Sequence, residues 1–489
     1  MARRSATWTR HDVGTCLDGS PAAFYYRAPR NGNTTSKFAI FLEGGGWCVS
    51  AADCVSRTAT TLGSSASWGS NVRSPGSGGH YFDSAMLGAE FANSGLVHMK
   101  YCDGASFSGS SATRLTASYG SVQLGRQSLE RGASFTIHSS GRATLMAALD
   151  LLLASPTVGL VHASDVLLSG CSAGGLAALL AAEAVHARLV AAGAPLVRFK
   201  VALFSGIFHS PAASPYTAQM RSVFQLAGMI PPPACARTLA KADAWRCVVG
   251  MRPLEALPAH IPVFVEQSAI DRWQTGCVLG AAPSKFETVR CSAGEWDSCL
   301  RYMHPLHPQQ RTPQSAQSAQ SAQSTSRSRR LGRELAARSA ATAQQQQCSD
   351  SQLDALDSFS RDFMRSLVDS PALRIAGRGA FLHGCHSHCP THLNRFAVNG
   401  ATLERAMIEW WRAPADTPTA QHTHIGCLPT WGLNGSAGSS SLVDSAFATA
   451  PNCKPKCSTL YPWPDERRKI AKRSRAVDEA LNGPEGAQE

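Results

Sequence analysis

The chain has 489 residues, of which 44% are apolar and 16% are charged. Ordinary globular chains carry about 25% charged residues and a similar apolar share, so a coiled coil and a wholly disordered chain are both excluded. A membrane-spanning helix needs roughly 18 consecutive apolar residues. The most apolar stretch, residues 176–190, already contains Glu183, His186 and Arg188, so we expect no membrane span.

Basic residues outnumber acidic ones by 46 to 34, which gives a formal net charge of +12. Six arginines and one glutamate place +5 of this charge in residues 308–347. No nucleic-acid-binding motif accompanies the charge, and we expect no nucleic-acid partner. The positive charge indicates attraction to acidic polymers, including acidic polysaccharides.

Short apolar runs alternate with helical patterns along most of the chain. Parallel sheets give such runs because their strands are buried on both faces, so the alternation predicts an α/β fold with a largely parallel central sheet flanked by helices. The expected strands are residues 37–42, 96–101, 166–169, 197–204 and 261–266, and the expected helices are residues 141–153, 176–190 and 349–368.

Residues 308–347 interrupt this alternation with a repeated Gln-Ser-Ala triplet and an Arg/Ser stretch. Such low-complexity sequence cannot bury enough apolar surface to order itself. We therefore predict one domain over residues 1–464, interrupted by a disordered insertion at 308–347 and followed by a charged tail at 465–489. No feature indicates an oligomer, and a monomer is expected.

Sixteen cysteines are clustered in the first hundred residues and in the second half of the chain. An even, high number predicts up to eight disulfides and a secreted protein. Residues 1–12 lack the apolar core of a signal peptide, which favours an incomplete or mature N-terminus. The alternative is a zinc site that uses Cys385-x3-Cys389 and Cys453-x3-Cys457, but the usual Cys-x-x-Cys pairs are missing.

Gly170-Cys171-Ser172-Ala173-Gly174 matches the G-x-S-x-G pattern between an expected strand and an expected helix. A nucleophile elbow needs this arrangement, because its sharp turn leaves room only for small residues two places on either side of the serine. The turn exposes the serine hydroxyl and places the N–H of the next residue beside it. Ser172 is therefore the candidate nucleophile.

A serine hydroxyl needs a base, and the base needs an orienting acid, in the chain order Ser, acid, His. Asp271 lies in the loop just beyond the expected strand at residues 261–266, whereas its competitor Glu266 lies within that strand. The residues alone do not choose the base among six later histidines, which are His383, His386, His388, His392, His422 and His424. Cys385 and Cys389 bracket two of these, so a disulfide could hold either one rigidly.

Gly44-Gly45-Gly46-Trp47 follows the first expected apolar strand. A glycine-rich loop at this place allows the backbone to approach a developing oxyanion and to supply its second donor. A tight structural turn is the alternative interpretation of the same four residues.

These motifs resemble the pectin acetylesterase family, which includes the Notum carboxylesterases. The resemblance rests on residues 16–21, 42–48, 101–107, 170–175, 270–274 and 385–389, and it spans most of the chain. It departs from the family at Phe204-Ser205-Gly206, where members carry an aspartate.

The resemblance implies a secreted, disulfide-bonded α/β-hydrolase without metal or cofactor. It implies a catalytic triad of Ser172, Asp271 and His388, because the family motif Cys-x-x-His-Cys selects His388 over His386. It also implies oxyanion donors at Gly46, Trp47 and Ala173.

The activity expected from the resemblance is the removal of acetyl esters from an acidic cell-wall polysaccharide. The alternatives are a Notum-like removal of a fatty acyl group from a protein and a catalytically inactive carbohydrate-binding homologue.

Overall fold

The structure is a computed structural model. It describes residues 7–30, 35–76, 89–211, 214–280, 350–390, 397–398, 400–426, 477 and 480–482. The predicted insertion at 308–347 lies outside these residues, as do Cys453, Cys457 and most of the predicted tail.

Within the described residues, a ten-stranded sheet runs in the order β16-β13-β12-β11-β10-β3-β5-β2-β1-β4. From β16 to β5 all neighbouring strands are parallel, whereas β2, β1 and β4 pair in antiparallel fashion. The strands are Trp8–Thr15 (β1), Pro21–Arg27 (β2), Lys37–Leu42 (β3), Asn71–Val72 (β4), Gly95–Met99 (β5), Asp165–Cys171 (β10), Arg198–Phe204 (β11), Val263–Ser268 (β12), Gly379–His383 (β13) and Thr423–Ile425 (β16). The predicted α/β fold with a largely parallel sheet is confirmed.

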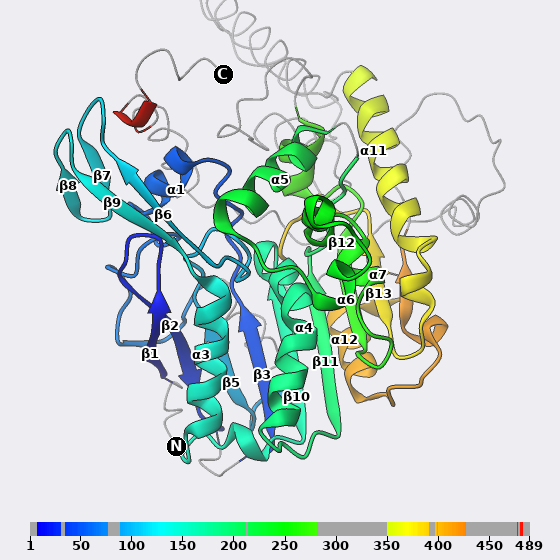
Figure 1. Cartoon of the computed structure of the whole chain (residues 1–489). Coiled ribbons are helices and arrows are strands. Elements are labelled where there is room, and N and C mark those ends of the chain that lie inside the picture. Colours follow the sequence, from blue (N-terminus) through cyan, green and yellow to red (C-terminus); the bar gives the residue numbers. More distant parts are fainter. Residues whose placement is uncertain are drawn as a thin grey trace, which may run out of the picture.

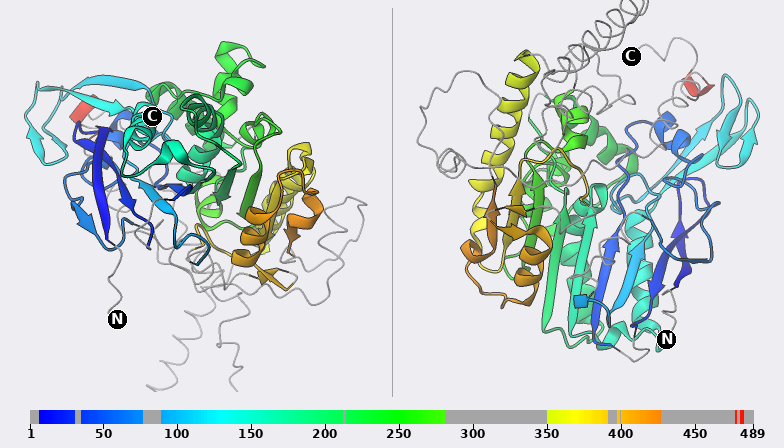
Figure 2. Two further views of the ribbon diagram at one scale, coloured as in Figure 1. Left: turned by 90° about the horizontal axis from the view of Figure 1, so that it is seen from below. Right: turned by 180° about the vertical axis from the view of Figure 1, so that it is seen from behind.

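Helices cover both faces of the sheet (Figures 1 and 2). Helices α3 (Gly141–Ala154) and α4 (Ala173–Ala191) lie on one face, and α12 (Leu403–Arg412) lies on the other. The amphipathic helix α11 (Asp350–Val368) flanks the sheet near β13. Other helices are α1 (Ala51–Arg57), α5 (Pro215–Ala227), α6 (Pro233–Ala236), α7 (Arg252–Glu255) and α8 (Arg272–Gln274), with the short helices η3 (Lys241–Val248) and η6 (Pro371–Arg374).

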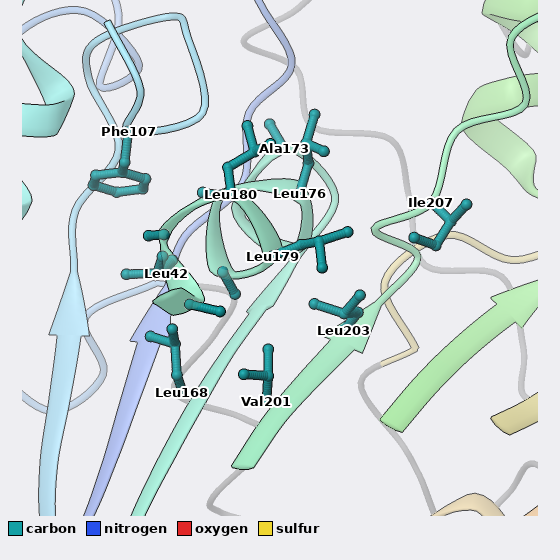
Figure 3. Close-up of a cluster of buried hydrophobic side chains, with 14 of the residues drawn as sticks. Leu42, Phe107, Leu168, Ala173, Leu176, Leu179, Leu180, Val201, Leu203 and Ile207 are labelled. Carbon is teal, nitrogen blue, oxygen red and sulfur yellow. The ribbon is translucent and has the colours of Figure 1, made fainter. Parts of the chain in front are cut away.

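The two faces of the sheet are buried in separate cores because side chains alternate along a strand. In β3, Phe38 and Ile40 join the core beneath α3 and α4, while Ala39 and Phe41 join the core beneath α12. Figure 3 shows the first core around α4, with Leu42, Leu168, Leu176, Leu179, Leu180, Val201 and Leu203 gathered between helix and strands.

Helix α4 is long and apolar enough to cross a membrane by length and composition. Its place in the fold explains this composition, because 67% of its most apolar window is buried inside the protein. Ala and Leu dominate the helix, and both favour helical backbone while allowing close packing on β10 and β11. It is a core helix of the α/β layer.

The antiparallel part of the molecule was not predicted. It includes β1, β2 and β4 of the large sheet. It also includes three two-stranded ribbons among the described residues: β6 (Ser111–Thr116) with β9 (Ser134–Ser139), β7 (Val122–Leu124) with β8 (Gln127–Leu129), and β14 (Ala397–Val398) with β15 (Ala401–Thr402). Three residues of the predicted tail, Val477, Ala480 and Leu481, pack into the apolar cluster between α1 and the ribbons formed by β6 to β9.

Disulfides join Cys16 to Cys102, Cys171 to Cys389 and Cys235 to Cys247. Cys277 and Cys385 are also disulfide-bonded, while Cys48 and Cys54 are buried free thiols. A disulfide-rich fold is therefore confirmed. The bond at Cys389 reaches Cys171, the residue before Ser172, and neither sulfur of the Cys385-x3-Cys389 pair is left as a thiolate for zinc.

Candidate active site

Ser172 occupies the turn between β10, in the middle of the sheet, and α4. Its φ of 59° lies in the left-handed region that side chains rarely adopt. A Cβ at Gly170 would collide with the carbonyl of Gly174, and one at Gly174 would collide with the carbonyl of Leu42. Only glycine fits at both positions, so these two glycines permit the strained turn that the elbow pattern predicted.

The glycine-rich loop after β3 runs directly against this turn. A Cβ on Gly44 would lie 2.9 Å from the Cβ of Ser172, so glycine is required for the approach. Gly46 has a φ of 69°, which also favours glycine. Within the described part of the chain, the backbone N–H groups of Gly46, Trp47 and Ala173 donate to no acceptor. Buried N–H groups are almost always paired, so these three are available to a ligand.

Asp271 follows β12 and caps helix α8. Its Oδ1 accepts hydrogen bonds from the backbone N–H groups of Trp273 at 3.0 Å and Gln274 at 2.9 Å. Its Oδ2 lies 2.8 Å from Nδ1 of His388, and the Asp271 side chain is fully buried. The backbone bonds fix the carboxylate and leave its second oxygen for the imidazole.

His388 lies in the loop after β13, and its side chain keeps 11% of its surface exposed. Because Nδ1 faces a carboxylate, it carries the proton in the neutral ring, and Nε2 is left as the basic atom. The disulfide between Cys171 and Cys389 joins the residue before Ser172 to the residue after His388, with 5.7 Å between their Cα atoms. It therefore ties the elbow to the histidine loop.

The other candidate histidines have different partners. Nε2 of His386 lies 3.3 Å from the Thr275 hydroxyl, and Nε2 of His383 lies 2.8 Å from Oε1 of Glu266. His422 precedes β16 and His424 lies within it, at an edge of the sheet. His392 lies outside the described residues. The structure thus places His388 beside Asp271, whereas Glu266 bonds to His383.

Sequence reasoning missed a network beneath the histidine loop. Glu266 Oε2 accepts the backbone N–H of Ser205 at 2.9 Å, and the Ser205 hydroxyl accepts the N–H of Cys389 at 3.1 Å. His383 Nδ1 accepts the N–H of Cys385 at 3.2 Å. The signal was present, because a glutamate inside an otherwise apolar strand needs a buried partner. The network supports both ends of the loop that carries His388.

Four aromatic side chains form a wall beside His388. The ring of Trp47 lies 4.9 Å from Phe208, 5.4 Å from Trp273 and 6.0 Å from Tyr216. Phe208 and Trp273 each lie 6.4 Å from the imidazole. All four are buried, so the rings fill space on one side of His388.

A buried ion pair holds the start of the glycine-rich loop. Nζ of Lys100 lies 2.6 Å from Oε1 of Glu43, and the N–H of Tyr101 donates to Oε2 at 3.1 Å. Burial acts to raise the pKa of Glu43, but the charge of Lys100 and the nearby His98 ring, 3.9 Å from Oε1, outweigh it and lower this pKa to about 2. The carboxylate is therefore ionised at any pH at which the protein would be assayed.

A family profile described as pectinacetylesterase matches residues 7–330, more than half of the chain. The chain belongs to the pectinacetylesterase family. Pectin acetylesterase 7 of Arabidopsis thaliana is 26% identical over 381 residues, which cover 76% of each chain. Pectin acetylesterase 11 of the same plant is 24% identical over 435 residues, 85% of this chain and 88% of that one.

The family is one of carboxylesterases and reaches beyond plants. The palmitoleoyl-protein carboxylesterase NOTUM of Homo sapiens is 27% identical over 274 residues, 53% of this chain and 49% of its own. The solved structure of the Wnt deacylase Notum from Drosophila is 19% identical and covers 83% of this chain and 93% of its own, with a TM-score of 0.53. The predicted family and its α/β-hydrolase fold are both confirmed.

Proposed function

We propose that this pectinacetylesterase-family chain is a serine carboxylesterase that removes acetyl groups from an acidic polysaccharide. The observation that carries the proposal is the Asp271–His388 hydrogen bond at 2.8 Å, on a loop that a disulfide ties to the elbow of Ser172. The disulfides and the family support a secreted protein acting at a cell wall.

The proposed reaction proceeds through an acyl-enzyme. His388 Nε2 takes the hydroxyl proton of Ser172 as the serine oxygen attacks the ester carbonyl. Asp271 holds the imidazole in the required tautomer and stabilises the imidazolium that forms. The N–H groups of Gly46, Trp47 and Ala173 bind the oxyanion. As the intermediate collapses and the ester C–O bond breaks, His388 gives the proton to the leaving sugar oxygen. Water activated by His388 then attacks the acyl-enzyme and releases acetate from Ser172 by the same steps.

Two observations support the substrate class. The net charge of +12 favours an acidic polymer. The buried wall of Trp47, Phe208, Tyr216 and Trp273 fills space beside His388, which favours a short acyl group over a fatty one.

Acetate release from a panel of acetylated pectin, xylan and mannan tests the proposal, with Ser172→Ala as the control. The expected result is preferential release from pectin and none by the variant. A series of p-nitrophenyl esters from acetyl to palmitoyl tests the acyl length. Preference for the long esters would replace the acetyl proposal with a fatty-acyl one, and no turnover of any ester would contradict esterase activity.

A further inference from the structure

Three consecutive carbonyls of the glycine-rich loop, at Gly45, Gly46 and Trp47, are hydrogen-bonded. Among the described residues, the N–H groups of Gly46 and Trp47 donate to no acceptor. Arg57 donates from Nη1 to the Gly45 carbonyl at 3.1 Å and from Nη2 to the Trp47 carbonyl at 2.7 Å. The Tyr101 hydroxyl donates to the Gly46 carbonyl at 2.6 Å. Two side chains therefore hold three consecutive carbonyls.

Peptide geometry converts these bonds into an orientation of the N–H groups. A trans peptide is planar, so the carbonyl of one residue and the N–H of the next point in opposite directions. The bond to the Gly45 carbonyl thus aims the N–H of Gly46 away from Arg57. The bond to the Gly46 carbonyl aims the N–H of Trp47 away from Tyr101. These are the two loop donors of the proposed oxyanion hole.

Both side chains are themselves rigidly held. Arg57, the last residue of α1, is 3% exposed, and its Nε lies 3.9 Å from Asp53 Oδ2. The Tyr101 side chain is fully buried, and its hydroxyl accepts the N–H of Ser106 at 3.0 Å while it donates to Gly46. Because the Tyr101 oxygen already accepts the Ser106 N–H, its own proton is directed at the Gly46 carbonyl. Burial keeps water from replacing the bonds that Arg57 and Tyr101 make to the loop.

We propose that Arg57 and Tyr101 are positioning residues that preorganise the oxyanion donors of Gly46 and Trp47 by fixing the two peptide planes. The inference rests on the proposed esterase function. It assigns transition-state stabilisation to two residues that touch neither the substrate nor the catalytic triad. Donors already oriented need no rearrangement as the oxyanion forms, which is the source of their catalytic effect.

Tyr101→Phe and Arg57→Lys test the proposal. The first removes only the hydroxyl, and the second keeps the charge but loses the fork that spans two carbonyls. We expect kcat on p-nitrophenyl acetate to fall roughly 10- to 100-fold, less than the 10²–10³ lost when a donor is removed outright. KM should stay within about twofold, because the lost interaction forms only in the transition state.

The inhibition constant of a boronic acid distinguishes the two roles, because a purely structural role of Arg57 and Tyr101 would leave it unchanged. The tetrahedral adduct of the boronic acid on Ser172 places an oxygen where the oxyanion forms, so the inhibition constant should rise in parallel with the loss in kcat/KM. The pH midpoint of kcat/KM should not change, because the Asp271–His388 bond is intact. If Tyr101→Phe does not fold, Arg57→Lys carries the same test.

Matched controls exist elsewhere in the fold. Tyr25 is buried, and its hydroxyl also donates to a glycine carbonyl, that of Gly69 at 2.6 Å. Arg378 is fully buried and donates to the carbonyls of Leu254, Leu257 and Ala372. Tyr25→Phe and Arg378→Lys should therefore lose stability without losing boronic-acid affinity.

The outcomes separate this inference from the function on which it rests. If Ser172→Ala keeps its esterase activity, the proposed function is wrong. If Ser172→Ala is inactive but Tyr101→Phe and Arg57→Lys bind the boronic acid as the wild type does, the inference is overturned. Equal losses of boronic-acid affinity in the control variants would overturn it as well.

Discussion

His386 and His388 are two positions apart in one loop, yet they meet different groups. His388 bonds to a buried carboxylate and His386 to a threonine hydroxyl. His388→Ala should lower kcat by at least about 10³-fold, because members of a triad act as a unit. His386→Ala should remain within about tenfold of the wild type. Initial rates on p-nitrophenyl acetate measure both, and the reverse order would show that His386 is the base.

The Glu43–Lys100 pair predicts a defined pH dependence of stability. The folded-state pKa of Glu43 is about 2, below its ordinary value of 4.5. A depressed carboxyl pKa contributes stability that is fully present above pH 4.5 and is lost as the pH falls through about 2. A shift of this size corresponds to roughly 3 kcal/mol.

Urea unfolding of the wild type and of Glu43→Gln tests this pH dependence. The difference in the free energy of unfolding should be constant above pH 4.5 and shrink at lower pH. Comparing the two proteins cancels the titration of all other carboxyls. A difference that stays constant between pH 5 and pH 2 would contradict the ion pair.

The sequence identified individual candidate residues where their signal was local. Ser172 was predictable because the strand, the turn and the helix around it are contiguous. Asp271 was predictable because acids of this kind follow a strand. The residues alone did not identify His388, because its partner is 117 positions away, and only the family motif chose it. The sequence offered Glu266 only as a competitor of Asp271. The bond of Glu266 to His383 was not predicted, because these two residues are also 117 positions apart.

Between elements, the Cys171–Cys389 disulfide is the covalent link that aligns the proposed nucleophile and base. The double variant Cys171→Ala/Cys389→Ala should lose about 2–5 kcal/mol of stability. It should also lose turnover, because the histidine loop is no longer tied to β10. Calorimetry and initial rates measure the two effects.

Cys235→Ala/Cys247→Ala is the matched control, since it removes a disulfide between α6 and η3. It should lose stability while keeping turnover near that of the wild type. If both double variants lose turnover equally, the alignment role of Cys171–Cys389 is wrong.

The strands that the sequence predicted are buried on both faces. Strands β3, β10, β11 and β12 are buried on both faces, so they appear in the sequence as mostly apolar runs, although β11 contains Lys200 and β12 contains Glu266. Strands β1 and β6 alternate between partly buried and exposed residues and contain several polar side chains, so their sequences resemble loops. Their pairing is set by tertiary contacts that no local pattern records.

At the scale of the whole molecule, the sheet brings four separate stretches of chain to one edge. The glycine-rich loop, Ser172, Asp271 and His388 follow β3, β10, β12 and β13 in turn, and these strands are parallel. Ligands of open α/β sheets bind at the carboxyl ends of their strands. The fold therefore assembles the candidate site from residues that lie far apart in the sequence, and the two ends of this span, Glu43 and His388, are 345 positions apart.

Active-site labelling tests whether Ser172 is the nucleophile of an esterase. The wild-type protein is treated with a fluorophosphonate, digested and mapped by mass spectrometry, alongside folded Ser172→Ala. We expect one adduct per chain on the peptide that contains Ser172, loss of esterase activity in step with labelling, and no adduct on the variant. Labelling of a different serine, or full esterase activity after Ser172 is modified, would contradict this role of Ser172.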